Sequence, residues 1–427
     1  MIVNLKEQHC ENFLQSLHKE QWQKVRLGEV AEINPKESLK KHCLYKKVSM
    51  DSLEPYTKKI YSFSIESFSG GAKFRNGDTL LARITPCLEN GKTAFVDFLQ
   101  DDEIAFGSTE FIVLRKKTGT SNQDFLYYLA RSKHLREVAI QSMTGSSGRE
   151  RVQIEVLRDF TFQLPPLAIQ QKIAEILSSF DDKIDLLHRQ NKTLESLALT
   201  LFRHYFIDNP RNPKSVVGVG ESLRGGGSDF AIQAPPSSHQ KSGKWEMGKL
   251  GDYVRIELGG TPNTAKSEYW GGDIAWINSG EINKFRIVKP TKTITKLGFE
   301  KSSTKLLPKG SVVIAITGAT LGQVSLLEID SCANQSVVGV IPNDDFSSEF
   351  LYLWIKFNID EIILNQTGGA QQHINKNDIA NYHIIKPDKE SLASVNLKTY
   401  FEKISHNTKQ IQNLQAMRDM LFKAIFA

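Results

Sequence analysis

Two long stretches of the chain carry seam positions at alternating spacings of three and four, the pattern of helices that pack on other helices. The first runs roughly from Leu167 to Phe206, and its predicted seam is Ile184, Leu187, Asn191, Leu194, Ala198, Leu201 and Tyr205. The second runs from Glu390 to Phe426, and its seam is Ile404, Asn407, Ile411, Leu414, Arg418, Leu421 and Ile425. One such tract fits an amphipathic helix packed on its own domain equally well, but two matching tracts favour helices that pack on each other. Polar seam residues usually fix register, so we interpret Asn191 and Asn407 as alignment residues.

Shorter apolar runs predict strands and short helices between these tracts. Gly77 and Gly310 each supply a turn, and each is followed by an apolar run too short for a helix, at 79–82 and 312–315. A second pair of runs, Phe125–Leu129 and Phe350–Trp354, predicts a short helix. The chain therefore reads as mixed α and β structure.

These features occur twice in the same order, which indicates an internal duplication. Trp22 and Trp245 lie 223 positions apart, and Thr144-Gly145 is echoed by Thr367-Gly368 at the same offset. Arg26-Leu27-Gly28-Glu29-Val30 likewise corresponds to Lys249-Leu250-Gly251-Asp252-Tyr253. Ordered matches at a nearly constant offset predict two copies of one unit, each a globular part followed by a long helix.

A segment rich in Pro, Gly and Ser separates the copies and predicts a flexible linker. It contains Gly225-Gly226-Gly227-Ser228 and four prolines. Because an extended chain covers up to ~3.3 Å per residue, this segment could return to the start of the first helix and allow the two helices to lie antiparallel. The predicted division is 1–165 and 245–387 for the globular parts, 166–208 and 388–427 for the helices, and 209–244 for the linker.

Composition narrows the class of protein only slightly. A chain of 427 residues predicts two or more domains. The net charge of +6 permits a polyanionic partner without requiring one. Four scattered cysteines form no CxxC pair, and no apolar run is long enough for a signal peptide or a membrane span. We therefore expect a cytoplasmic protein with reduced thiols and no membrane contact.

Motifs of catalysis are missing from the sequence. We find no GxxxxGK[ST] phosphate loop, no GxGxxG cofactor loop, and no Asn- or Asp-Pro-Pro-aromatic motif of adenine methyltransferases. No HExxH or cysteine–histidine spacing predicts a metal site. Single carboxylates such as Asp78 and Glu110 lack a partner at a telling spacing, so we interpret them as solvated or turn residues. The sequence predicts no catalytic residue.

The candidate DNA-contacting residues lie in loops between predicted strands. Arg pairs with guanine edges, Gln pairs with adenine edges, and small residues allow the backbone to approach phosphate. The first pair of loops supplies Ser146, Ser147, Arg149 and Arg151 in copy one and Gly369, Gln371, Gln372 and His373 in copy two. The second pair supplies Arg83, Thr85, Asn90 and Lys92, and Thr317, Thr320 and Gln323. For any one of these residues the alternative is an ordinary surface turn or an exposed charge without a role.

Several motifs together resemble the specificity (S) subunit of type I restriction–modification systems, over nearly the whole chain. The first copy carries Gly77-Asp78-Thr79-Leu80-Leu81-Ala82-Arg83-Ile84-Thr85-Pro86, Leu164-Pro165-Pro166-Leu167 and Gln170-Gln171-Lys172-Ile173-Ala174. The second carries Gly259-Gly260-Thr261-Pro262, Tyr269-Trp270-Gly271-Gly272-Asp273-Ile274 and Thr317-Gly318-Ala319-Thr320.

This resemblance implies an α+β fold: a tandem pair of mixed α/β target-recognition domains, each followed by a long helix, with the two helices in an antiparallel coiled coil. Each domain would read one half of a split, asymmetric site in double-stranded DNA. About 40 helical residues at ~1.5 Å each would separate the domains by ~60 Å. Two methyltransferase subunits would bind around the helices and restriction (translocase and nuclease) subunits would join them. S-adenosylmethionine, ATP and Mg would bind those partners, and this chain would bind no cofactor.

The sequence hypothesis is therefore sequence-specific DNA binding without catalysis, as one subunit of a site-specific deoxyribonuclease and adenine methyltransferase complex. Two alternatives remain. One is a restriction–modification polypeptide with fused catalytic domains, although the two copies and the linker already account for the chain. The other is a coiled-coil scaffold that binds only protein.

Overall fold

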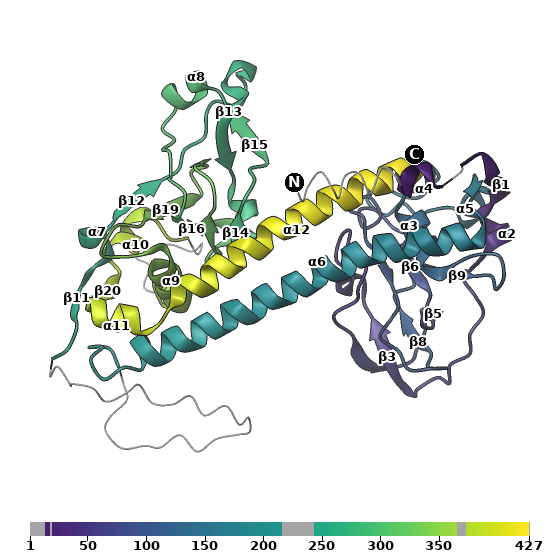
Figure 1. Cartoon of the computed structure of the whole chain (residues 1–427), viewed down its shortest axis with the longest axis horizontal. Helices are drawn as coiled ribbons and strands as arrows, with labels where there is room; N and C mark the ends of the chain where they lie inside the picture. The colour runs from purple at the N-terminus through teal and green to yellow at the C-terminus, as the bar shows by residue number, and fades with distance from the viewer. Residues whose placement is uncertain (1–12, 18, 216–242, 365–372, 427) are drawn as a thin grey trace. The chain divides into compact units, whose positions relative to one another are not determined.

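The computed structural model describes residues 13–17, 19–215, 243–364 and 373–426 of the chain (Figure 1). The chain divides into two units. Unit 1 is Met1–Leu186 with Gln412–Ala427, and unit 2 is Leu187–Ile411. Because each division falls inside a long helix, both helices contribute a segment to each unit.

Unit 1 contains two four-stranded sheets, ordered β2-β9-β6-β7 and β4-β3-β8-β5, and the antiparallel pair β1-β10. Its strands are β1 Gln23–Arg26, β2 Ala31–Ile33, β3 Leu44–Val48, β4 Ser64–Ser67, β5 Ala72–Phe74, β6 Thr79–Ala82, β7 Thr93–Phe95, β8 Ala105–Gly107, β9 Phe111–Lys116 and β10 Thr161–Leu164. Its short helices are η1 Lys19–Gln21, α2 Leu27–Val30, η2 Met50–Ser52, α3 Gln123–Arg131, α4 Lys133–Gln141 and α5 Ile154–Asp159.

Unit 2 contains a five-stranded sheet, β12-β19-β16-β17-β14, a three-stranded sheet, β15-β13-β18, and the pair β11-β20. Its strands are β11 Glu246–Lys249, β12 Arg255–Leu258, β13 Trp270–Ile277, β14 Arg286–Ile287, β15 Lys292–Ile294, β16 Val312–Ala315, β17 Val324–Leu327, β18 Cys332–Ala333, β19 Val337–Ile341 and β20 His383–Lys386. Its short helices are α7 Leu250–Tyr253, η4 Ser267–Tyr269, η5 Ser279–Asn283, α8 Lys296–Glu300, η6 Gly318–Thr320, α9 Ser348–Leu364, α10 Lys376–Asn381 and α11 Lys389–Ser394.

The two units repeat one topology, which confirms the duplication predicted from the sequence. In unit 1 the fully buried strand β6 lies between β9 and β7, and in unit 2 the fully buried β16 lies between β19 and β17. The turn before each buried strand is a glycine with positive φ, Gly77 at 85° and Gly310 at 88°, as the sequence predicts. The amide of Leu27 donates to the carbonyl of Phe160, and that of Leu250 donates to Tyr382, both at 2.8 Å.

The long helices are α6, Leu167–Phe202, continued by the π-helical turn η3, Arg203–Ile207, and α12, Leu397–Phe426. The first matches the predicted tract. The prediction that the second tract is continuous from Glu390 is wrong, because α11 ends at Ser394 and α12 begins at Leu397. The backbone at Val395 is extended, and the Asn396 side chain accepts a hydrogen bond from the Thr399 amide at 3.3 Å. A side chain that caps a helix in this way favours a new start.

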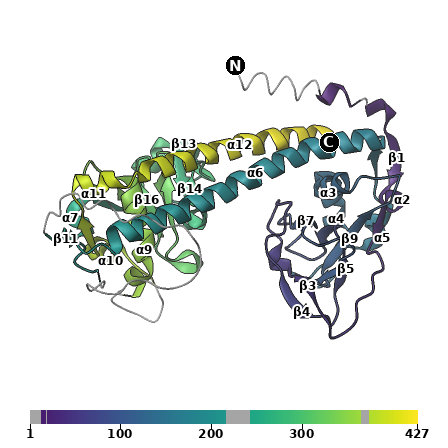
Figure 2. The same ribbon diagram turned by 60° about the horizontal axis from the view of Figure 1, so that its bottom comes forward.

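In each unit, segments of α6 and α12 pack together in the core. The start of α6 and the end of α12 share the core of unit 1 through Leu177 and Leu421, and α3 lies between them and the sheet that contains β6 (Figure 2). The end of α6 and the start of α12 share the core of unit 2 through Phe202 and Phe401. Because the start of one helix meets the end of the other, they run in opposite directions, as predicted.

The predicted seam positions differ in burial. Asn191, Leu194, Leu201, Tyr205, Leu414 and Arg418 are half-buried. The buried positions are Ile184, Leu187, Ala198, Ile404, Asn407, Ile411, Leu421 and Ile425.

The chain that follows the first long helix also belongs to unit 2. Residues 209–215, which the sequence assigned to the linker, fold onto unit 2. The buried Asn212 amide donates to the carbonyls of Phe206 and Ile207 at 3.0 and 3.1 Å, and Arg211 pairs with Asp388 at 2.6 Å. Within the described ranges, no helix combines the length and apolar character needed to cross a membrane.

Candidate nucleic-acid interface

The two candidate loops of copy one form a single site in unit 1. Ile84 and Arg151 form an antiparallel β-bridge. On either side of it, the Val152 amide donates to the Arg83 carbonyl at 2.9 Å and the Thr85 amide donates to Glu150 at 3.1 Å. The segment that follows β6 is thereby joined to the segment that precedes α5, although about 70 residues separate them in sequence.

The predicted residues of this site fall into two groups. Ser146, Ser147 and Arg149 are exposed on the 144–151 loop, and Asn90 is exposed on the other loop. Thr85 is half-buried, with its hydroxyl 3.2 Å from the Met143 sulfur.

The other cations of the site are held by the protein itself. The Lys92 ammonium donates to the Met50 carbonyl at 2.9 Å. Arg151 binds the Glu110 carboxylate with Nη2 at 2.7 Å and Nε at 3.0 Å, and this hydrogen bonding raises the pKa of Arg151. These two residues therefore shape the loops, whereas Arg149 is the exposed cation of the 144–151 loop.

Asp78 and Glu110 lie in or beside turns, one of the two interpretations that the sequence allowed, and each also binds an arginine. Asp78 is buried and accepts hydrogen bonds from Arg115 Nε and Nη2, both at 2.7 Å, and this pairing raises the pKa of Arg115. Glu110 holds Arg151 as described above. Both carboxylates are partners of arginines, which a single sequence does not reveal because their partners are about 40 residues distant.

A groove of about 590 Å³ lies beside Arg83, and the sequence analysis missed most of its lining. Lys36, Lys73 and Thr109 line it with Arg83. The one carboxylate in the lining, Glu37, is bound by Arg75 at 2.6 Å and Arg115 at 2.7 Å. The hydrogen bond from Arg75 is the largest cause that lowers the pKa of Glu37. Burial raises this pKa, but the hydrogen bond from Arg115 lowers it further, so the pKa lies below its usual value. The groove therefore presents a surplus of positive charge, which suits a phosphate backbone.

In unit 2 the described candidates of the corresponding site carry hydroxyl, amide and imidazole side chains. The Ile374 amide donates to the Ile316 carbonyl at 3.2 Å, in the same way that Val152 donates to Arg83 in unit 1. Thr317, Thr320 and Gln323 are half-buried on the adjoining loop, and His373 is exposed. The remaining candidates of copy two, Gly369, Gln371 and Gln372, lie outside the residues that the structure describes.

A turn that the sequence analysis did not select completes this site. The Thr261 hydroxyl hydrogen-bonds to the Gln335 side chain, and the backbone of Gly259 lies against Asn334. A Cβ at Gly259 would clash with the Asn334 carbonyl oxygen, so a glycine is required for this approach. The equivalent parts of unit 1 are the Asn34 turn and Thr109, which line the groove. The Gly259-Gly260 pair was the available signal in the sequence.

The described part of the chain contains no cluster of three or more His, Cys, Asp or Glu side chains arranged to hold a metal ion. The candidate interface of each unit instead consists of basic, hydroxyl and amide side chains around a turn and two loops. Such side chains bind phosphates and base edges by hydrogen bonding and charge.

Comparison with known proteins agrees with this architecture. The family model described as type I restriction modification DNA specificity domain matches residues 19–196 and again 242–416. The chain therefore belongs to this family and contains two copies of its domain, and it is a type I restriction system specificity subunit.

Its relatives include specificity subunits of two type I restriction enzymes. The type I restriction enzyme HindI specificity subunit of Haemophilus influenzae is 26% identical over 408 residues, covering 84% of this chain and 88% of the relative. The MjaIX specificity subunit of Methanocaldococcus jannaschii is 26% identical over 336 residues, covering 74% of each. The crystal structure of a type I restriction–modification S subunit from M. genitalium shares the fold, with a TM-score of 0.56 and 15% identity over 95% of this chain and 96% of that one.

Proposed function

We propose that this chain reads a bipartite, asymmetric site in double-stranded DNA, one half with each unit. The observation that carries the proposal is the pair of equivalent sites: both join the loop after a buried strand to a second loop, at Arg83–Val152 and Ile316–Ile374. The side chains on these loops differ, with Arg149 in unit 1 and Thr317 and His373 in unit 2. Equal scaffolds with unlike side chains suit two unlike half-sites.

Affinity and specificity would come from different residues. Each good bidentate base contact is worth ~1–3 kcal/mol of discrimination, and exposed Arg149 is the best placed residue of unit 1 for such a contact. Exposed Lys36 in the groove would instead meet phosphate, which adds a salt-dependent term without sequence preference.

The chain itself would be non-catalytic and would bind no cofactor. Two methyltransferase subunits would dock around α6 and α12, restriction subunits would join them, and S-adenosylmethionine, ATP and Mg would bind to those partners. The HindI and MjaIX relatives are specificity subunits of type I restriction enzymes, which supports a role of this kind for the chain.

Exchange of residues 20–160 for those of a relative tests the proposal. With methyltransferase subunits present, we expect the methylated site to change in one half only, as measured by modification-sensitive sequencing of a random DNA library. A change in both halves would reject separate reading by the two units. Absence of any sequence preference would favour a scaffold that binds protein only, and methylation or cleavage by the purified chain alone would favour a fused enzyme.

A further inference from the structure

Each unit contains a buried tyrosine whose hydroxyl donates to a carboxylate of α6. In unit 1, Tyr128 donates to Asp181 at 2.7 Å, and in unit 2, Tyr352 donates to Glu195 at 2.7 Å. The two tyrosines lie in the corresponding helices α3 and α9, one position out of register, because Tyr352 corresponds to Tyr127. The two carboxylates do not correspond, because they lie only 14 positions apart on the same helix.

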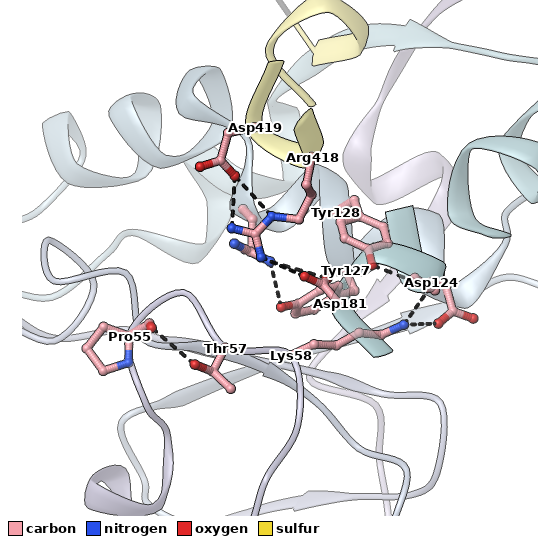
Figure 3. A network of polar contacts seen from close by, with 11 residues as sticks. Pro55, Thr57, Lys58, Asp124, Tyr127, Tyr128, Asp181, Arg418 and Asp419 are labelled. Carbon is pink, nitrogen blue, oxygen red and sulfur yellow. Dashed lines mark hydrogen bonds and ion pairs between the residues drawn. The ribbon is translucent and has the colours of Figure 1, made fainter. Parts of the chain in front are cut away.

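In unit 1 the carboxylate is also paired with a cation from α12 (Figure 3). Arg418 Nη1 donates to Asp181 at 2.6 Å, with side-chain exposures of 11% and 8%. Burial alone would lower the pKa of Arg418, but the Asp181 carboxylate more than offsets it, so the pKa lies above its usual value. A carboxylate this buried needs a cation opposite it.

The repeat relates these charges in an unexpected way. The offset of 223 places Arg418 of α12 at the position of Glu195 in α6, and Ile404 at the position of Asp181. The two equivalent positions therefore carry opposite charges: a guanidinium in unit 1, at Arg418, and a carboxylate in unit 2, at Glu195. Each charge suits its own surroundings, since Arg418 meets Asp181 and Glu195 accepts from Tyr352.

The asparagines of the seam are a second, independent case in which equivalent positions of α6 and α12 carry unlike side chains. The Asn407 side-chain amide donates to the Asn191 carbonyl oxygen at 2.9 Å, and Asn407 is fully buried. At the same offset, the position of Asn191 corresponds to Leu414 and that of Asn407 to Ile184. The amides therefore meet each other only when α6 pairs with α12.

We propose that these two polar pairs are a recognition code that makes α6 pair only with a helix of the α12 type and prevents it from pairing with α6 of a second copy of this chain. Two α6 helices in the same geometry would set Asp181 against Glu195 and Asn191 against Ile184. Two α12 helices would set Arg418 against Ile404 and Asn407 against Leu414. Each like pair leaves a buried charge or amide without its partner on the other helix, and two α6 helices also set two carboxylates against each other; both are unfavourable. This inference does not depend on the proposed DNA binding.

A gain of self-association tests the code in the full chain. Asn191→Leu with Glu195→Arg gives α6 the side-chain types that α12 carries at these two positions, so its copies in two molecules would match. We expect a several-fold larger dimer fraction than for the unchanged chain, measured by native mass spectrometry and sedimentation. The control, Asn191→Leu with Glu195→Gln, loses the same asparagine and carboxylate without gaining a cation. Equal dimer fractions in the two variants would overturn the code.

A second measurement isolates the charge at position 418. Arg418→Glu places there the residue of α6, and Arg418→Gln is its neutral match. Near pH 8 we expect Arg418→Glu to lower the thermal midpoint more than Arg418→Gln. Two like charges at this site repel each other, so the difference should shrink as the pH falls and the carboxylate introduced at position 418 takes a proton. Tyr128, Arg131 and Asp419 are the other ionisable groups in contact with this pair, and they are common to both variants. Equal midpoints at all pH values would reject the proposal.

Discussion

Unit 1 and unit 2 share their topology but differ in the chemistry of equivalent places. At the candidate interface, the second loop of unit 1 carries Arg149 and Arg151, and Arg151 pairs with Glu110, whereas the described loop residues of unit 2 are Thr317, Thr320, Gln323 and His373. The strands beneath, β6 and β16, are buried along their whole length in both. The comparison teaches that duplication retained the scaffold and that the side chains on the loops were free to diverge.

The way each unit holds the long helices differs as well. In unit 2, Phe202 and Phe206 of the first helical tract pack against Phe350, with ring centroids 5.3 Å apart in both cases. In unit 1, α6 and α12 meet α3 around the polar contacts of Asp181 with Tyr128 and Arg418. At the unit 1 end, an ion pair between the two helices, Asp181 with Arg418, is therefore present in addition to apolar packing.

Removing an aromatic ring from unit 2 should have the largest effect. Phe350→Ala empties a site that is 1% exposed, and loss of a buried phenyl group costs about 4 kcal/mol of unfolding free energy. Urea unfolding measures this loss. Phe357→Ala, on the same helix but 40% exposed, is the matched control and should cost far less. Equal losses would contradict the assignment of Phe350 to the core.

Breaking the polar contact of unit 1 should have the next largest effect. Asp181→Asn leaves the buried Arg418 without the Asp181 carboxylate, and we expect a loss of about 3 kcal/mol of unfolding free energy. This value is at the low end of the usual range because Arg418 keeps its contact with Asp419 at 2.9 Å. Hydrogen exchange should locate the loss in unit 1. In the control, Asp182→Asn, the changed side chain is 60% exposed, and little change is expected. Protection lost equally in unit 2 would argue against separate stabilisation of the two ends.

A third difference is an acid-sensitive contact in unit 2, where Asp388 pairs with Arg211. The equivalent position of unit 1 is Pro165, which cannot form an ion pair. Burial raises the pKa of Asp388, but the Ser391 amide and Arg211 outweigh it and lower the pKa to about 2. A lowered pKa in the folded state contributes stability above the unfolded value of 3.8, and this stability is lost as pH falls toward 2. Asp388→Asn should cost about 1 kcal/mol near neutral pH after solvent screening and flatten the acid slope of the urea midpoint. An unchanged slope would refute this role.

The smallest effect is expected at the exposed loop of unit 1. Arg149→Ala should weaken DNA binding by roughly fivefold (~1 kcal/mol) and reduce the salt dependence if the contact is to phosphate, or relax one base preference if it is to a base edge. Fluorescence anisotropy with the methyltransferase partner present measures both. Lys133→Ala, an exposed cation on α4, is the comparison. An effect of Lys133→Ala as large as that of Arg149→Ala would indicate unspecific charge attraction.

Much of the architecture followed from local patterns. The seam spacing predicted both long helices, and the repeated turn glycines Gly77 and Gly310 predicted the buried strands and the duplication. These features depend on neighbours within one turn or one strand, so a single sequence contains them. The break before α12 was missed because the apolar spacing continues across it. The Asn396 side chain caps a new helix there, and the spacing does not reveal this.

The candidate site shows what a sequence alone leaves open. Residue types and loop positions were sufficient to propose Arg83 and Arg149, but nothing in the spacing joined the two loops or separated Arg149, which is exposed, from Arg151, which Glu110 holds. The groove residues Lys36 and Lys73 were missed for the same reason. Burial and ion pairing depend on partners brought together by the sheets, tens of residues apart in the chain.

The sequence by itself thus determined that there are two copies, each ending in a long helix, because period and repeat are properties of the chain. The antiparallel direction of the helices was only implied by the family resemblance. Only the tertiary structure decided which charges face one another. Asp181 and Arg418 are separated by 237 positions, and their contact arises because the start of α6 and the end of α12 share one core. The physical reason is that the stability of a buried charge depends on the groups around it, and here those groups come from both copies of the repeat.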